Sequence, residues 1–215
     1  TTTATINIGA NTFTDAAGNN NPAATQFSIQ VDTVAPTITI ASNKTTLKIG
    51  ETANLTFTLS EPASTALISS NITVAGGALS NFAGSGFTYT ATFTPTANIT
   101  TTATINIAAS TFTDAAGNNN NAATQFTITV DTAAPTITIT SSTSTLKSGQ
   151  TAVITFTLSE GSTGFAIGDI QTTGGTLSAL TAVSATFYTA IFTPTINSTT
   201  TATFNVAGNT FTDAA

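Results

Sequence analysis

Apolar residues alternate with threonines along several short stretches of the chain. In the stretch 52–59, Leu55, Phe57 and Leu59 are separated by single threonines, and the stretch 151–158 repeats this arrangement. A period of two places successive side chains on opposite faces of a β-strand. These stretches therefore predict half-buried antiparallel strands, with one face packed and the other carrying hydroxyl groups.

The same alternation, read together with the turn signals between stretches, predicts about seven strands in one repeat and no helix longer than about two turns. The expected strands are 37–41, 52–59, 72–74, 79–82, 87–93, 103–108 and 123–130. The Gly-Gly pair at 76–77 and the asparagines after Gly117 supply turns. Within the fifth strand, Phe87, Tyr89 and Phe93 are expected to face the core. Strands of this number and spacing are typical of a two-sheet sandwich.

A long segment of the sequence recurs at a fixed spacing. ATINIGANTFTDAAGN, which starts at Ala4, returns as ATINIAASTFTDAAGN at Ala103 and begins a third time at Ala202, so each step is 99 residues. A period near 100 residues is that of a complete domain and is too long for a solenoid coil. The sequence thus predicts an all-β chain of tandem immunoglobulin-like antiparallel β-sandwich modules with a 99-residue repeat.

The phase of the repeat divides the chain into three parts. Residues 1–31 are predicted to be the C-terminal strands of one repeat, residues 32–130 a complete repeat, and residues 131–215 a repeat that lacks its last strand. Because both ends fall inside a module, we expect the polypeptide to continue beyond this segment. The alternative is strand exchange between copies, since residues 23–31 have the pattern of a spare last strand.

Five sequence blocks follow one another in a fixed order: VDTVAPTITI, TLKIGETANLTFTLSE, ITVAGGALSNF, TYTATFTP and TFTDAAGN. As a set they closely resemble the bacterial Ig-like repeats found in tandem in giant surface adhesins and biofilm-associated proteins. The resemblance covers nearly the whole chain. It implies an extracellular or cell-surface location, an immunoglobulin-like sandwich used as a stalk or adhesive module, and often calcium at the junctions.

The charge of the chain narrows the choice of partners. Only 6% of the residues are charged, the formal net charge is −6, and there are three lysines and arginines in total. So few cationic groups cannot neutralise a phosphate backbone, which excludes nucleic acid. The sequence has no cysteine or histidine, which excludes disulfides and imidazole chemistry. No apolar run approaches the ~20 residues that span a bilayer, so we expect no membrane insertion in this segment.

The acidic residues gather at a few positions of the repeat. Seven of the nine occupy equivalent sites in different copies: Asp32 with Asp131, Glu61 with Glu160, and Asp15 with Asp114 and Asp213. In a sandwich of this topology, the end of the second strand and the loop before the last strand lie at the pole where the chain enters the domain. We therefore expect Asp32, Glu61 and Asp114 to meet at one pole, and their equivalents to meet at the next.

Three carboxylates in a lysine-poor chain repel one another unless a cation lies between them. Calcium takes roughly six to eight oxygen ligands, which amide and backbone oxygens can complete. The predicted metal ligands are Asp32, Glu61, Asp114, Asn118, Asp131, Glu160 and Asp213. The alternative is that Asp15 and Asp114 form turns in Asp-Ala-Ala-Gly and that Asp32 precedes a bend. The sequence leaves both interpretations open.

These features predict a structural or adhesive repeat region of an extracellular surface protein or filament. Its expected partners are neighbouring repeats of the same chain and other copies in a filament or matrix. The alternative is a non-catalytic accessory module of a secreted polysaccharide-degrading enzyme, which would expose aromatic rings to sugars. Alternation turns Tyr89 and Tyr188 inward, which disfavours that alternative. Catalysis is not expected, because histidine and cysteine are absent and the acids lie mostly at the junctions.

Overall fold

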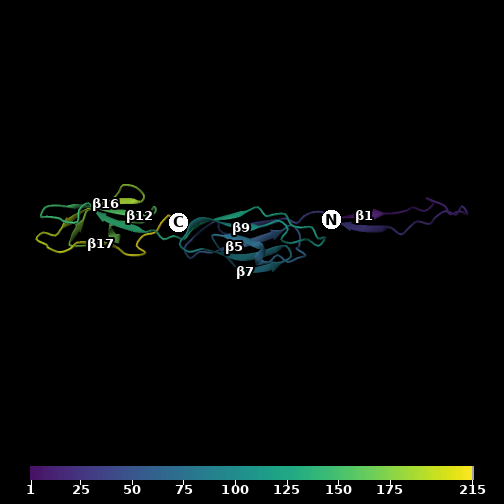
Figure 1. The fold of residues 1–215 in the computed structure, drawn as a ribbon, viewed down its shortest axis with the longest axis horizontal. Coiled ribbons are helices and arrows are strands. Elements are labelled where there is room, and N and C mark those ends of the chain that lie inside the picture. The colour runs from purple at the N-terminus through teal and green to yellow at the C-terminus, as the bar shows by residue number, and fades with distance from the viewer. Residues whose placement is uncertain (215) are drawn as a thin grey trace. The chain divides into compact units, whose positions relative to one another are not determined.

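Antiparallel strands make up almost all of the regular structure in the computed structural model, which describes residues 1–214 (Figure 1). The helical segments are three-residue 3₁₀ turns, η1 (Ser69–Asn71) and η2 (Ile167–Asp169). No helix among the described residues is long and apolar enough to cross a membrane. The predicted all-β class is confirmed.

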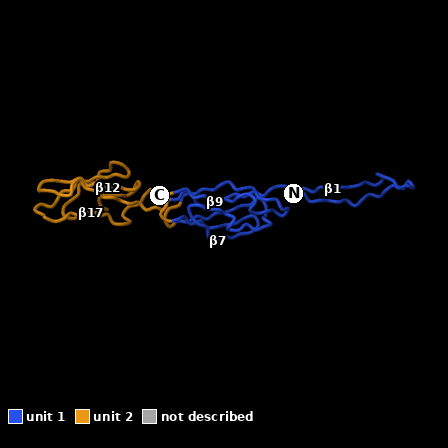
Figure 2. The backbone as a smooth tube through the Cα atoms, viewed as in Figure 1, with its two compact units in different colours: residues 1–46, 51–96, 101–130 blue, residues 47–50, 97–100, 131–215 orange. Residues whose placement is uncertain are grey.

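The chain divides into two compact units (Figure 2). The first consists of residues 1–46, 51–96 and 101–130. The second consists of residues 47–50 and 97–100 and of the chain from residue 131 onward.

The chain begins as a two-stranded ribbon. Strands β1 (Thr2–Ile6) and β2 (Phe27–Val31) pair antiparallel, with Thr2 opposite Val31 and Ile6 opposite Phe27. Every residue of both strands is exposed. The ribbon therefore has its backbone pairing, but its apolar side chains are not covered.

Two four-stranded sheets follow the ribbon, with the orders β3-β5-β8-β7 and β4-β10-β9-β6. Their strands are β3 (Ile38–Ser42), β4 (Thr46–Lys48), β5 (Ala53–Leu59), β6 (Ile72–Ala75), β7 (Gly77–Ser85), β8 (Thr88–Pro95), β9 (Thr100–Ile107) and β10 (Phe126–Asp131). All seven predicted strands occur close to their expected positions. Strand β4 was not predicted, because an alternation cannot be read from three residues.

The core of the first unit follows the predicted alternation, with one exception. Leu55, Phe57 and Leu59 on β5 are at most 3% exposed, and Tyr89 and Phe93 on β8 are also buried.

Phe87 is the exception. It is 52% exposed, so its predicted core position is wrong. The residue lies before β8 begins and follows Gly86, whose φ of 63° marks a turn, so the alternation of the strand does not extend to it. The equivalent residue of the next repeat is Thr186, so the phenylalanine is not a feature of the repeat.

The second unit repeats the plan in part. Its larger sheet has the order β11-β12-β16-β14, with β15 also paired to β16, and a smaller sheet contains β13 and β17. The strands are β11 (Ile137–Ser141), β12 (Ala152–Leu158), β13 (Ile170–Thr173), β14 (Gly175–Leu177), β15 (Thr181–Ala182), β16 (Phe187–Pro194) and β17 (Thr203–Val206). Phe156, Phe165 and Phe192 lie in its core.

The Gly-Gly pair between β6 and β7 carries the chain from one sheet to the other. Gly76 has a φ of 79°, a left-handed conformation that other residues adopt at a cost. At Gly77, a Cβ atom would lie 2.5 Å from the Thr94 carbonyl oxygen, so only glycine fits. Gly174 and Gly175 meet the same two constraints in the second unit. The predicted turn is therefore a crossing between sheets that requires both glycines.

Candidate metal centre

Asp32 directly follows β2 and leads the chain toward β3. Its Oδ1 accepts a hydrogen bond from the Val34 N–H at 3.2 Å, and its Oδ2 accepts one from the Thr1 hydroxyl at 2.9 Å. Its backbone carbonyl accepts a third, at 3.1 Å, from the side-chain amide of Asn118. Asp32 is thus tied through its backbone to the loop after β9.

Asp114 is in that loop and is only 2% exposed. Its Oδ1 accepts hydrogen bonds from the N–H groups of Ala116 and Asn118, both at 2.9 Å, and its Oδ2 accepts one from the Asn118 side chain at 2.8 Å. Gly117, with a φ of 90°, donates its N–H to the Asp114 carbonyl and closes the turn. The Asp-Ala-Ala-Gly-Asn sequence therefore fixes this carboxylate by local bonds.

Glu61 lies just after the end of β5. The Ser64 N–H donates to the Thr113 carbonyl at 2.7 Å, and the Thr113 N–H donates to the Thr65 hydroxyl at 2.9 Å. These two bonds hold the loop after Glu61 against the loop that carries Asp114. Within residues 1–214, no hydrogen bond or ion pair reaches the Glu61 carboxylate.

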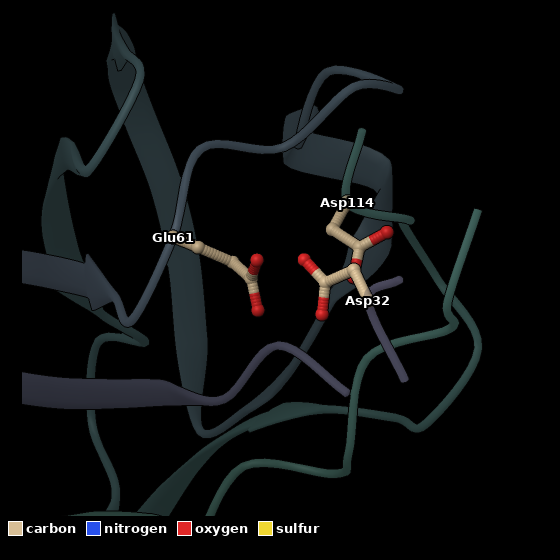
Figure 3. Close-up of side chains that lie close together, drawn as sticks. All are labelled: Asp32, Glu61 and Asp114. Atoms are coloured by element: carbon tan, nitrogen blue, oxygen red, sulfur yellow. The ribbon is translucent and has the colours of Figure 1, made fainter. Parts of the chain in front are cut away.

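The three side chains point toward one another (Figure 3). One carboxylate oxygen from each of Asp32, Glu61 and Asp114 lies within 4.8 Å of the other two. Two oxygens bound to one Ca²⁺ at about 2.3–2.6 Å can be at most about 5 Å apart. The spacing therefore allows all three oxygens to contact a single calcium ion, and the all-oxygen set suits a hard cation.

The pKa values of Glu61 and Asp114 are shifted in opposite directions. Burial, followed by the charges of Asp114 and Asp32, raises the pKa of Glu61 above its ordinary value. Burial also acts to raise the pKa of Asp114, but the hydrogen bonds from Asn118, Ala116 and Gly117 outweigh it and leave the pKa lowered. Glu61 is therefore the group whose charge is least compensated.

A second cluster of the same composition occurs in the second unit. One oxygen from each of Asp131, Glu160 and Asp213 lies within 4.8 Å of the other two. Burial, then the charges of Asp131 and Asp213, raises the pKa of Glu160. The two clusters therefore have the same residue types and the same 4.8 Å limit on the distances between their oxygens, and in each the pKa of the glutamate is raised.

The residue that approaches the leading aspartate is equivalent in the two clusters. The Thr1 hydroxyl donates to Asp32 Oδ2 at 2.9 Å. Thr100, which is 99 residues later, donates its hydroxyl to Asp131 Oδ1 at 2.8 Å. This hydroxyl contact therefore belongs to the repeat.

Asp15 forms the same turn as Asp114 but does not belong to a cluster of acids. It receives the same local hydrogen bonds as Asp114, from the N–H groups of Ala17 and Asn19 and from the Asn19 side chain. The acidic groupings found among the described residues do not include it. The turn therefore forms outside any of these groups of three acids, so it accounts for the local hydrogen bonds of Asp114 but not for the position of Glu61.

Two asparagines of the same loop act through hydrogen bonds. Asn118, a predicted metal ligand, directs its amide nitrogen toward Asp114 and Asp32, so the described contacts make it a hydrogen-bond donor to the cluster. Asn120, which the sequence analysis did not single out, is 2% exposed and accepts from the N–H groups of Thr111 and Phe112. Its recurrence as Asn21, 99 residues earlier, is the signal that could have identified it.

Comparison with known proteins gives one family. The model of the bacterial Ig-like domain matches residues 32–130 and, a second time, residues 131–215. No curated protein matches the chain. The two matches have the same phase as the sequence repeat and together cover most of the chain.

Proposed function

Because the chain belongs to the bacterial Ig-like domain family, we propose that it is a non-catalytic, structural repeat region of an extracellular surface protein or filament. The repeated sandwiches with a shared sequence phase support a stalk or adhesive role. The burial of Tyr89 and the inward packing of Tyr188 leave the accessory sugar-binding alternative without support from either tyrosine.

The proposal includes a calcium ion bound at each acidic cluster. The observation that carries this part of the proposal is the Glu61 carboxylate, which faces two other carboxylates and receives no hydrogen bond from residues 1–214. A divalent cation would neutralise this repulsion, with Asp32, Glu61 and Asp114 as ligands in the first unit. Asp131, Glu160 and Asp213 would serve in the second.

The physical effect of the cation is to fix the start of each sandwich. Asp32 lies between β2 and β3, whereas Glu61 and Asp114 belong to loops of the sandwich itself. A shared ion therefore restrains the leading residue on the domain that it precedes, and inter-domain motion is otherwise the default when an interface is small. In a tandem protein this restraint would make the array stiffer.

The test is thermal unfolding of the 215-residue chain in calcium and in chelator. At about 100 times the Kd, one site stabilises its unit by about 2.7 kcal/mol, which for a domain of ~100 residues raises the Tm by roughly 10–20 °C. The chain with Glu61→Gln and Glu160→Gln should lose most of this shift.

Asp15→Asn is the matched control, because Asp15 makes the same turn outside both clusters. It should keep the full calcium shift. Equal melting temperatures of the unchanged chain in calcium and in chelator would contradict the calcium proposal and return the acids to turn and linker roles.

A further inference from the structure

One buried amide side chain, that of Asn120, bonds to four backbone groups of the loop after β9. Its Oδ1 accepts hydrogen bonds from the N–H groups of Thr111 and Phe112 at 2.7 and 3.0 Å. Its Nδ2 donates to the carbonyls of Ala108 and Asn121 at 2.9 and 2.7 Å. Asn120 is 2% exposed, and a buried polar group is costly when it is left without a partner. The side chain therefore ties together the two ends of the loop.

These bonds close the base of a short ribbon that carries Asp114 at its tip. The Asn120 N–H donates to the Phe112 carbonyl at 3.0 Å, and the Asp114 N–H donates to the Asn118 carbonyl at 3.1 Å. Phe112 is 2% exposed, so the base of the ribbon is fixed in the interior of the unit. The position of Asp114 therefore depends on a base that Asn120 closes.

The same loop contacts the two segments that carry the other acids of the cluster. The Ser64 N–H, in the loop after β5, donates to the Thr113 carbonyl at 2.7 Å. The Asn121 N–H donates to the carbonyl of Pro36, in the segment that leads into β3, at 2.9 Å. The loop that Asn120 closes is thus bonded to both of the other segments.

The network around Asn120 recurs in another copy of the repeat. Asn21, 99 residues earlier, accepts from the N–H groups of Thr12 and Phe13 at 2.8 and 3.0 Å. It donates to the carbonyls of Gly9 and Pro22 at 2.9 and 2.8 Å. The residues that supply the two carbonyls differ in type between the copies. The network therefore belongs to the repeat and requires the asparagine rather than particular side chains around it.

We propose that Asn120 is a positioning residue of the acidic cluster, whose side chain closes the loop and so holds Asp114 within reach of Asp32 and Glu61. Asn120 itself contributes no oxygen to the cluster. Its effect on the geometry follows from these contacts, whereas its effect on calcium binding rests on the proposed function. Residues that orient metal ligands without touching the metal change metal affinity by about 10–100-fold.

Calcium titration of the 215-residue chain with Glu160→Gln measures the first cluster alone. In this background Asn120→Ala should weaken calcium binding by about 10–100-fold, because Asp114 is no longer held in place. Asn21→Ala is the matched control, since it removes the same bonds outside the groups of three acids, and it should leave the Kd unchanged. Phe57→Ala opens a cavity in the core of the same unit, so it should lower the Tm but leave the Kd of the folded chain unchanged.

Amide hydrogen exchange in chelator tests the geometry without calcium. In Asn120→Ala the N–H groups of Ser64 and Asn121 should exchange faster, because both bonds depend on the position of the loop. The Asn43 N–H, which donates to the Asn54 carbonyl elsewhere in the unit, should keep its rate. A change confined to the loop separates positioning from a general loss of stability.

Asn120→Asp is the second variant, for use where Asn120→Ala does not fold. It keeps the size of the side chain and an acceptor for the two N–H groups, but it loses the donor for the two carbonyls. The same amides should therefore change by a smaller factor. Unchanged exchange at Ser64 in a folded Asn120 variant, or an equal loss of calcium affinity in Asn120→Ala and Phe57→Ala, would overturn the proposal. A chain that binds no calcium would contradict the calcium sites, and exchange in chelator would then decide the role of Asn120 by itself.

Discussion

Glu61 and Glu160 occupy the same electrostatic situation in two copies of the repeat. Each is partly desolvated, each faces two aspartates, and each has a raised pKa for these reasons in that order. Asp114 differs, because its turn supplies enough hydrogen-bond donors to lower its pKa despite burial. The pKa values of two carboxylates in one cluster are therefore shifted in opposite directions, and protonation relieves the repulsion at the glutamate.

The pH dependence of Glu61→Gln follows from this difference. A raised pKa in the folded state means that the wild-type carboxyl contributes its full stability below the unfolded value of about 4.5 and loses it as the pH rises through the folded pKa. In chelator, Glu61→Gln should therefore match the wild type below this pH and become the more stable protein near neutrality. Urea unfolding at several pH values measures the difference.

Calcium should reverse this order. With the ion bound, the wild type gains stability by mass action and Glu61→Gln does not, so the variant becomes the less stable protein near neutrality. Glu51→Gln is the control, because Glu51 pairs with Lys44 at 2.9 Å outside the cluster. The same order of Glu61→Gln and wild type in calcium and in chelator would contradict a shared cation.

At the scale of single elements, repeated alternation was the most reliable guide. The stretch 52–59 predicted β5 and its buried face, because a period of two over eight residues admits few other structures. Strand β4 was missed because three residues carry no period, and Phe87 was misplaced because the alternation was extended into a turn.

Convergence of distant acids was predictable for a different reason. Asp32, Glu61 and Asp114 recur at a spacing of 99 residues, and the sandwich topology places strand ends at one pole. The hydrogen-bond networks around them were not predictable, because the partners of Asn118 and Asn120 depend on loop conformations that a turn-forming sequence does not specify.

Core packing of the central strands gives a prediction at this scale. Phe57 on β5 and Phe156 on β12 are 0% exposed at equivalent positions of the two units. Replacement of either by Ala should lower the free energy of unfolding of its unit by ~3–5 kcal/mol, because it removes buried surface and leaves a cavity.

Phe87→Ala is the control for this measurement. Since Phe87 is 52% exposed, its loss should cost no more than about 0.5 kcal/mol. Denaturant unfolding of the three variants gives the values. A loss of less than about 1 kcal/mol for Phe57→Ala would show that the alternation does not define the core.

The whole chain combines a repeated fold with a repeated cluster. Each sandwich carries its own set of three acids, and each set includes the residue that leads into that sandwich, Asp32 or Asp131. The family match gives the modules a shared architecture, and the clusters place three carboxylates together in each of them. A ligand that acts at every repeat has an effect that grows with the number of repeats.

The corresponding prediction concerns a tandem array of several repeats. With calcium bound, the leading residue of each sandwich is held by two of its own loops, so the range of angles between successive sandwiches should be narrow. Chelation should release these residues and broaden the angular distribution, because small interfaces permit inter-domain motion. Small-angle X-ray scattering should then show a lower mean radius of gyration and a wider distance distribution in chelator. Asp114→Asn in every repeat should give this result even in calcium, whereas Glu51→Gln, which lies outside the clusters, should not. Identical scattering profiles of the unchanged array in calcium and in chelator would mean that the clusters do not set its stiffness, whatever their effect on melting.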